Sequence, residues 1–230
     1  MSEPRLTRRG SLVRLGGFAA ALFGASGWRL EEDADGAGPA AVASGAVKCV
    51  LTPEQTEGPY YIPDERIRRN ITDGRPGTPL LLRATVVDAS TCRPIRRAAV
   101  DIWHADASGV YSGFGAGAGN RTFMRGIQRT DVHGLAVFRS VYPGWYPGRT
   151  VHIHVKVHIG GNVVHTGQLY FPDATTDAAY RAAPYNRRPG RDTRNATDSV
   201  YRNGGRRSML TVRKNANGYL AAITMGVHRS

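Results

Sequence analysis

From about residue 80 onward, short runs of apolar and β-branched residues alternate with clusters of turn residues. Such a pattern is typical of strands joined by turns. A Gly-Gly pair at 160–161 predicts a hairpin between two of these runs. The predicted strands cover residues 80–88, 98–104, 135–141, 150–159, 162–171 and 218–227.

Two segments outside the predicted strands have a different character. Residues 44–79 carry turn residues and no helical periodicity, so we expect an irregular N-terminal arm packed on a core. Residues 173–208 are polar and rich in arginine, which predicts a long covering loop with at most short helical turns. Several short strands with turns between them favour an all-β fold, namely an antiparallel, transthyretin-like β-sandwich. We expect residues 44–230 to form it as one domain.

The first 43 residues predict an export signal. Arg8 and Arg9 precede a weakly apolar stretch at 15–28 that is too short to span a bilayer. Paired arginines in this position are typical of a bacterial twin-arginine signal, although Ser11 stands where that signal usually has a phenylalanine. An ordinary secretory signal or a basic tail is the alternative. We expect residues 1–43 to be removed and the rest to act outside the cytoplasm, with no membrane-spanning helix.

The 230-residue chain is basic, with 31 Lys and Arg against 18 Asp and Glu and a formal net charge of +13. Residues 1–43 hold five basic and five acidic residues, so their removal leaves the charge unchanged. Residues 181–214 hold ten basic and two acidic residues. Aromatic side chains are sparse there, and an exported protein rarely meets nucleic acid, so we expect no nucleic-acid partner. A solvated basic surface that could steer anionic aromatic molecules is the preferred interpretation.

Two cysteines, Cys49 and Cys92, are too few for a disulfide scaffold or a zinc cluster. In an oxidising compartment they are most simply one disulfide. That bond would tie the N-terminal arm to the loop at 88–92 and stabilise the fold by roughly 3–4 kcal/mol. Two unrelated buried thiols are the alternative.

His152 and His154 lie two residues apart in the predicted strand at 150–159. Side chains of a strand alternate between its faces, so both imidazoles project to the same side and form a natural metal-binding pair. Lys156 and His158 continue the same face. An exposed polar face is therefore a rival interpretation of the pair.

Three further blocks strengthen the metal interpretation. They are Tyr-Pro-Gly-Trp-Tyr-Pro-Gly-Arg at 142–149, Val-Asp-Ile-Trp-His at 100–104 followed by Tyr111, and Gly-Gln-Leu-Tyr-Phe at 167–171. Together they resemble the intradiol ring-cleavage dioxygenases. These are non-haem iron(III) oxidoreductases that use O₂ to open catechols between their two hydroxyls. The opening Cys-Val-Leu-Thr-Pro-Glu at 49–54 is similar to the secreted branch of that family.

The resemblance implies iron(III) ligands at four positions: Tyr111, Tyr146, His152 and His154. Iron(III) is a hard, highly charged ion that favours anionic oxygen donors, and two neutral imidazoles complete such a site. Tyr146 would also act as the base that takes the catechol protons. Arg149 would stabilise charge on the catecholate ring, and Gln168 would border the substrate pocket.

Other interpretations of the neighbouring residues stay open. Arg149 could be a surface arginine, and Gln168 could be a hydrogen-bonding residue inside a strand. We expect His165 at the surface, and Tyr60 and Trp103 in the core or in the pocket wall.

Two functions of different classes compete. The first is a secreted iron(III) intradiol dioxygenase that converts a catechol-type small molecule and O₂ to a muconate-type product. The second is a metal-free sandwich that binds anions or cell-envelope polymers. A degenerate module would be expected to lose at least one of the four ligands, whereas all four positions are filled here. This favours the enzyme, and it leaves both the particular catechol and the oligomeric state open.

Overall fold

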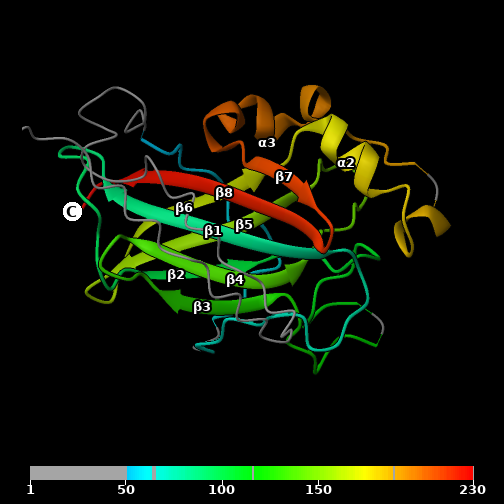
Figure 1. Ribbon diagram of the computed structural model, residues 1–230, viewed down its shortest axis with the longest axis horizontal. Helices are drawn as coiled ribbons and strands as arrows, with labels where there is room; N and C mark the ends of the chain where they lie inside the picture. Colours follow the sequence, from blue (N-terminus) through cyan, green and yellow to red (C-terminus); the bar gives the residue numbers. More distant parts are fainter. Residues whose placement is uncertain (1–50, 64–65, 116, 189, 230) are drawn as a thin grey trace, which may run out of the picture. The chain divides into compact units, whose positions relative to one another are not determined.

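The computed structural model describes residues 51–63, 66–115, 117–188 and 190–229. Within these residues, eight strands form two four-stranded sheets that pack as the layers of a sandwich (Figure 1). The predicted all-β sandwich is therefore confirmed. The strands are β1 Pro79–Asp88, β2 Ala99–Trp103, β3 Arg125–Arg129, β4 Leu135–Val141, β5 His152–Ile159, β6 Asn162–Tyr170, β7 Thr211–Asn215 and β8 Gly218–Val227.

One sheet has the strand order β4-β1-β8-β7 and the other the order β3-β2-β5-β6. Neighbouring strands run antiparallel in every pair except β1 and β8, which run parallel. The prediction of a purely antiparallel sandwich is wrong at this pair. Antiparallel neighbours can be joined by a short turn, whereas β1 and β8 are separated by all the other strands, so no hairpin dictates their direction.

The core lies between the two sheets and fixes which face each strand presents. Ile153, Val155 and Val157 of β5 are fully buried against it, as is Leu82 of β1. Burial of each such side chain stabilises the fold by about 1.5–3 kcal/mol. A shift of β5 by one residue would place its histidines in this core and its valines outside. The register therefore directs the even-numbered residues of β5 to the outer face of their sheet.

The six predicted strands are all present, with ends that differ by two residues at most. The hairpin at 160–161 is confirmed, and both glycines have a positive φ, which glycine adopts without strain. The two strands that the pattern missed, β3 and β7, both lie at a sheet edge. Their sequences, Arg-Gly-Ile-Gln-Arg and Thr-Val-Arg-Lys-Asn, are mostly polar. Most of β7 is exposed, as an edge strand can be, whereas Arg125 and Gly126 of β3 are buried.

The segment after β6 folds into short helices that lie beside β6 and β7 (Figure 1). This agrees with the predicted covering segment. The helices are α2 Asp173–Ala179, η1 Tyr185–Arg187, η2 Asn195–Thr197, α3 Ser199–Arg202 and η3 Gly205–Ser208.

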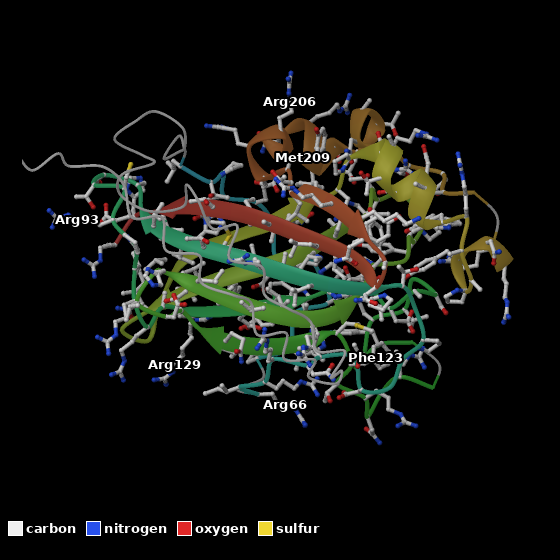
Figure 2. All side chains as sticks on the ribbon, viewed as in Figure 1. Arg66, Arg93, Phe123, Arg129, Arg206 and Met209 are labelled. Atoms are coloured by element: carbon white, nitrogen blue, oxygen red, sulfur yellow. The ribbon has the colours of Figure 1, made fainter. Side chains whose placement is uncertain are left out.

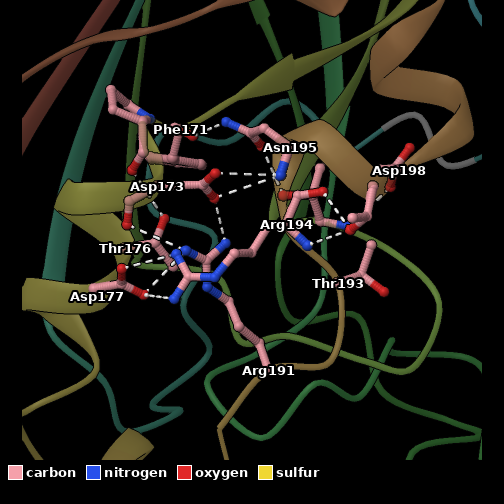
Figure 3. Close-up of polar contacts among 12 residues, drawn as sticks. Phe171, Asp173, Thr176, Asp177, Arg191, Thr193, Arg194, Asn195 and Asp198 are labelled. Carbon is pink, nitrogen blue, oxygen red and sulfur yellow. Dashed lines mark hydrogen bonds and ion pairs between the residues drawn. The ribbon is translucent and has the colours of Figure 1, made fainter.

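Part of the positive charge in this segment is neutralised internally. Arg191 lies 2.5 Å from Asp173 and 3.0 Å from Asp177, and Arg194 lies 3.0 Å from Asp177 (Figure 3). The interpretation of a solvated basic surface is therefore wrong for Arg191, whose side chain is 4% exposed. Other arginines do point outward, as Figure 2 shows for Arg93 and Arg206.

The arm at 51–63 is irregular, as predicted, and crosses the sheet that contains β5 and β6. The export signal at 1–43 and Cys49 lie outside the described residues, so the signal and the Cys49–Cys92 bond stay predictions. In the part of the chain that the structure describes, no helix has the length and apolar character needed to cross a membrane.

Candidate functional site

His152 and His154 of β5 lie side by side on the outer face of their sheet, away from the core. Their Nε2 atoms are 3.1 Å apart. The two residues are only 3% and 1% exposed, because the arm and two loops cover this face. The rival interpretation of an exposed polar face is therefore wrong at this pair. Lys156, two residues further along, is also buried and forms an ion pair with Glu57 of the arm.

Two tyrosines from different loops meet the histidine pair. The hydroxyl of Tyr146, in the loop between β4 and β5, lies 3.2 Å from Nε2 of His152. The ring of Tyr111, in the loop after β2, lies 5.5 Å from that of Tyr146 and 6.0 Å from that of His154. The structure thus brings together all four residues that the sequence predicts as ligands.

A tight turn positions Tyr146. Its backbone forms an isolated β-bridge with that of Arg149, so the chain reverses direction between the two residues. Gly148 lies inside this turn with φ of 80°, a left-handed conformation that strains other residues. The Tyr-Pro-Gly-Arg sequence therefore brings the tyrosine and the arginine to the same pocket from one short loop.

Buried polar contacts hold the loop of Tyr111. The next residue, Ser112, donates a hydrogen bond to the carbonyl oxygen of Phe123 at 2.6 Å. Arg125 of β3 donates to the carbonyl oxygen of Ser112 at 2.7 Å and is itself 3% exposed. Tyr60 of the arm stacks on the ring of Tyr111, with centroids 4.3 Å apart. Tyr111 is thus fixed from both sides, which a metal ligand requires.

Burial sets the protonation states at the site. It lowers the pKa of His152 to about 3 and that of His154 well below its usual range, and the nearby charge of Arg149 adds to both shifts. Both imidazoles are therefore neutral at neutral pH, as metal ligands must be. Burial also raises the pKa of Tyr146, and it raises that of Tyr111 well above the ordinary value. The protein alone therefore disfavours phenolates here, and a cation would be needed to form them.

The donor atoms fit a metal ion. Nδ1 of His152 lies 2.6 Å from the carbonyl oxygen of Thr150, so this nitrogen carries the proton and Nε2 offers its lone pair to the pocket. The hydroxyl of Tyr111 is buried and has no hydrogen-bond partner among the described residues. A buried polar group without a partner is costly unless something else binds it. Two imidazole nitrogens and two phenol oxygens could hold a hard, highly charged ion.

Both tyrosines are essential to this set. Across the described stretches of the chain, His, Cys, Asp and Glu alone form no group of three or more that could hold a metal. A metal site built without Tyr111 and Tyr146 would therefore have only two protein ligands.

Arg149 and Gln168 lie next to this set. Nη2 of Arg149 donates to Oε1 of Gln168 at 2.5 Å, and Nε donates to Asp198 at 2.9 Å. Gln168 is fully buried and lies directly opposite His154 on the neighbouring strand. The alternative that Arg149 is a surface residue is wrong, because its side chain is 18% exposed and tied to both partners.

Asp198 is the residue at this site that the sequence analysis missed. It is 1% exposed, and it also accepts hydrogen bonds from the backbone N–H of Thr150 at 2.7 Å and of Tyr201 at 2.8 Å. Its only sequence signal is that it is one of two acids in the basic segment at 181–214. The segment therefore carries the counter-ion of Arg149 as well as surface charge.

Aromatic rings and the arm form the walls of the pocket. Trp103 of β2 stacks on His154 in a nearly parallel arrangement, with ring centroids 4.9 Å apart. The arm passes so close that a Cβ atom at Gly58 would lie 3.3 Å from the His154 ring. Tyr60 and Trp103 are thus wall residues, as the sequence suggested.

His165 was expected at the surface and is instead 2% exposed. The arm lies over β6 at this point, and Glu54 of the arm contacts Nδ1 of His165 at 3.0 Å. Sequence alone could not place the arm there, because the two residues are far apart in the chain.

The fold and the site define a class: a β-sandwich protein with a covered pocket of two histidines and two tyrosines. Residues 56–182 match the family model described as Dioxygenase, which is more than half of the chain. The chain belongs to the intradiol ring-cleavage dioxygenase family, which confirms the resemblance stated from its motifs.

Among curated proteins, the chain is 31% identical over 140 residues to a chlorocatechol 1,2-dioxygenase of Cupriavidus pinatubonensis, covering 50% of this chain and 52% of that protein. It is 35% identical over 101 residues to a catechol 1,2-dioxygenase of Acinetobacter baylyi, covering 41% of this chain and 32% of that protein. The chain thus spans about half or less of the length of these relatives.

Solved structures match over more of the chain. An intradiol ring-cleavage dioxygenase from Tetranychus urticae superposes with a TM-score of 0.75 at 35% identity, covering 78% of this chain and 95% of that one. The dioxygenase domain of a dioxygenase–carbohydrate-binding protein fusion from Streptomyces sp. SirexAA-E gives a TM-score of 0.62 at 32% identity, covering 79% and 100%.

Proposed function

We propose that this protein is an iron(III) intradiol dioxygenase that cleaves a catechol-type ring between its two hydroxyls with O₂. The products would be muconate-type dicarboxylates. The observation that carries the proposal is the convergence of Tyr111, Tyr146, His152 and His154 in one covered pocket. The relatives, which include a catechol and a chlorocatechol 1,2-dioxygenase, support the substrate class.

The two histidines, through Nε2, and the two tyrosines, through their hydroxyl oxygens, would hold the iron. When bound, iron(III) supplies a Lewis acid that lowers the pKa of phenol hydroxyls, both in the protein and in a catechol. The neutral imidazoles suit this role because they add no positive charge of their own.

Tyr146 and Arg149 would perform the steps assigned to the protein. The hydroxyl oxygen of Tyr146 faces the pocket in which the catechol would bind. As a phenolate, it can therefore accept a catechol proton. Burial opposes the charge of Arg149, but the neighbouring Tyr146 and Asp198 raise its pKa above the ordinary value, so it stays a cation. A cation fixed beside the ring would stabilise negative charge that develops on it. The rings of Tyr60 and Trp103 would exclude water.

The colour of the iron-loaded protein tests the ligand set. We expect a visible absorption band from tyrosinate-to-iron(III) charge transfer that changes when catechols are added without oxygen and decays when oxygen enters. A panel of catechols in the same titration would identify the preferred substrate. The Tyr219→Phe variant is a matched control, because Tyr219 is a buried core tyrosine of β8 and should leave the band unchanged. Colourless protein with bound iron would contradict the assignment of both tyrosines.

We also propose that the protein is exported through the twin-arginine route. The Arg8→Lys, Arg9→Lys double variant should keep the protein inside the cell, because that route requires paired arginines. The measurement is the fraction of protein recovered outside the cytoplasm, with Arg5→Lys as the control. Normal export of the double variant would point to another route.

A further inference from the structure

A second hollow of about 780 Å³ opens on the outer face of the β3-β2-β5-β6 sheet. It lies toward the hairpin that joins β5 to β6, so it is distinct from the pocket of the two histidines and two tyrosines. Ile67, Ile127 and Ile159 supply apolar surface, and Ile67 is 62% exposed. The volume lies in the range of small-molecule sites, and exposed apolar surface inside a hollow favours a ligand with an apolar body.

Positive charge surrounds this apolar surface. Arg96, Arg97 and Arg129 line the hollow, and all three are exposed. None of their guanidinium groups has an acidic partner among the described residues. Three such groups around one hollow favour an anionic ligand.

The backbone at Arg97 adds an independent observation. Its φ of 64° lies in the left-handed region, which is uncommon for residues other than glycine. The backbone N–H of Arg97 donates to the carbonyl oxygen of Thr130 at 3.0 Å, which holds this conformation. Strained residues that the surrounding structure holds in place cluster at binding sites.

The acidic residue in the lining does not cancel this charge. Asp101 is 6% exposed and accepts a hydrogen bond from the hydroxyl of Tyr61 at 3.3 Å. It lies opposite Lys156 on the neighbouring strand, and both side chains share the same face. Its carboxylate therefore faces a hydroxyl and Lys156, which also pairs with Glu57. Among the described residues that line the hollow, three arginines stand against this one acid. His158, also in the lining, is partly buried.

We propose that this hollow binds a small aromatic anion, with its ring on the isoleucines and its carboxylate on Arg97 and Arg129. This inference does not depend on the proposed ring-cleaving function, because it uses none of the residues at the histidine pair. One layer of aromatic rings separates the hollow from that pocket. Tyr61 contacts Trp103 with centroids 4.7 Å apart, and Trp103 stacks on His154.

Equilibrium dialysis of the purified, iron-loaded protein with 2-naphthoate tests the site. The uncharged 2-naphthamide is the matched probe, and the visible spectrum is followed in parallel. We expect each chain to bind one naphthoate that leaves the visible spectrum unchanged, in addition to any naphthoate that changes it. Naphthamide should bind more weakly. The Arg97→Gln, Arg129→Gln double variant should lose about tenfold in affinity for naphthoate and little for naphthamide.

Arg206→Gln is the control variant, because Arg206 is an exposed arginine of η3 that lies far from Arg129 (Figure 2). It should leave naphthoate binding unchanged. If the double variant does not fold, Arg129→Gln alone carries the test, because it alters an exposed side chain of an edge strand. Equal affinity for the two probes, or equal affinity of the Arg129 and Arg206 variants, would overturn the proposal. Binding of naphthoate to protein without iron would show that the hollow works whether or not the proposed ring-cleaving function is correct.

Discussion

In the Tyr146→Phe variant, turnover of catechol is expected to fall by about 10²–10⁴-fold, the usual contribution of a general base. The change removes one hydroxyl, which lies 3.2 Å from Nε2 of His152, and keeps the ring that contacts Tyr60 and Tyr111. Loss of the base should lower kcat, whereas the walls that bind the ring stay in place. The measurement is oxygen uptake under single-turnover and steady-state conditions.

Two comparisons make this result specific. Tyr219→Phe removes a hydroxyl from the core and should leave kcat unchanged. The iron content of Tyr146→Phe must also be measured, because three ligands would remain at the site. Unchanged turnover by an iron-loaded Tyr146→Phe protein would show that another group takes the catechol protons.

The Asp198→Asn variant is expected to lower kcat by about 10-fold to 100-fold with a smaller change in KM. The N–H groups of Thr150 and Tyr201 bond to different oxygens of the Asp198 carboxylate, so asparagine, with one carbonyl oxygen, can keep only one of these two bonds. The variant also removes the charge that holds Arg149. Asp198 is a positioning residue, because it contacts the arginine and not the reacting atoms. A ring bound next to a loosely held guanidinium would bind almost as well and react more slowly.

The same variant should lose about 2–4 kcal/mol of stability at neutral pH, because it leaves a partly buried cation without its partner. Burial opposes the charge of Asp198, but the N–H groups of Tyr201 and Thr150 and the charge of Arg149 lower its pKa overall. A lowered folded-state pKa gives stability that is present above the unfolded pKa of about 4 and lost as the pH falls through the folded value. The stability gap between wild type and variant should therefore close in acid.

Asp177→Asn is the matched control for both readouts. Asp177 pairs with Arg191 and Arg194 in the same segment (Figure 3). The side chain of Arg149 instead bonds to Asp198 and Gln168. It should leave kcat unchanged. Equal kcat for the Asp198 and Asp177 variants would mean that Arg149 keeps its position without a counter-ion.

The histidine pair could be located from sequence because its geometry is local. Residues 152 and 154 share a face in any strand, and the valines between and after them mark the other face as the core side. The same local logic found β4 and β8 with their observed ends. It failed at β3 and β7, whose mostly polar residues resemble those of a loop.

What the sequence could not supply is contact between distant segments. Asp198 reaches Arg149 across 49 residues, and no local pattern marks the one acid in a basic stretch that turns inward. His165 was predicted outside because nothing in β6 reveals that the arm covers it. The parallel pairing of β1 and β8 is missed for the same reason. From the sequence, only the resemblance to a family predicted that the two tyrosines lie beside the histidines.

The arm determines when the pocket can be completed during synthesis. Gln55 donates hydrogen bonds to the carbonyl oxygens of Val200 at 2.8 Å and Asn203 at 3.0 Å, which lie 145 and 148 residues later in the chain. The arm therefore leaves the ribosome early but finds these partners only after nearly the whole domain has emerged. An iron ion held under the arm would be enclosed only after translation is almost finished. The iron would then be captured only when the domain has nearly finished folding. This order suits a route that exports folded proteins.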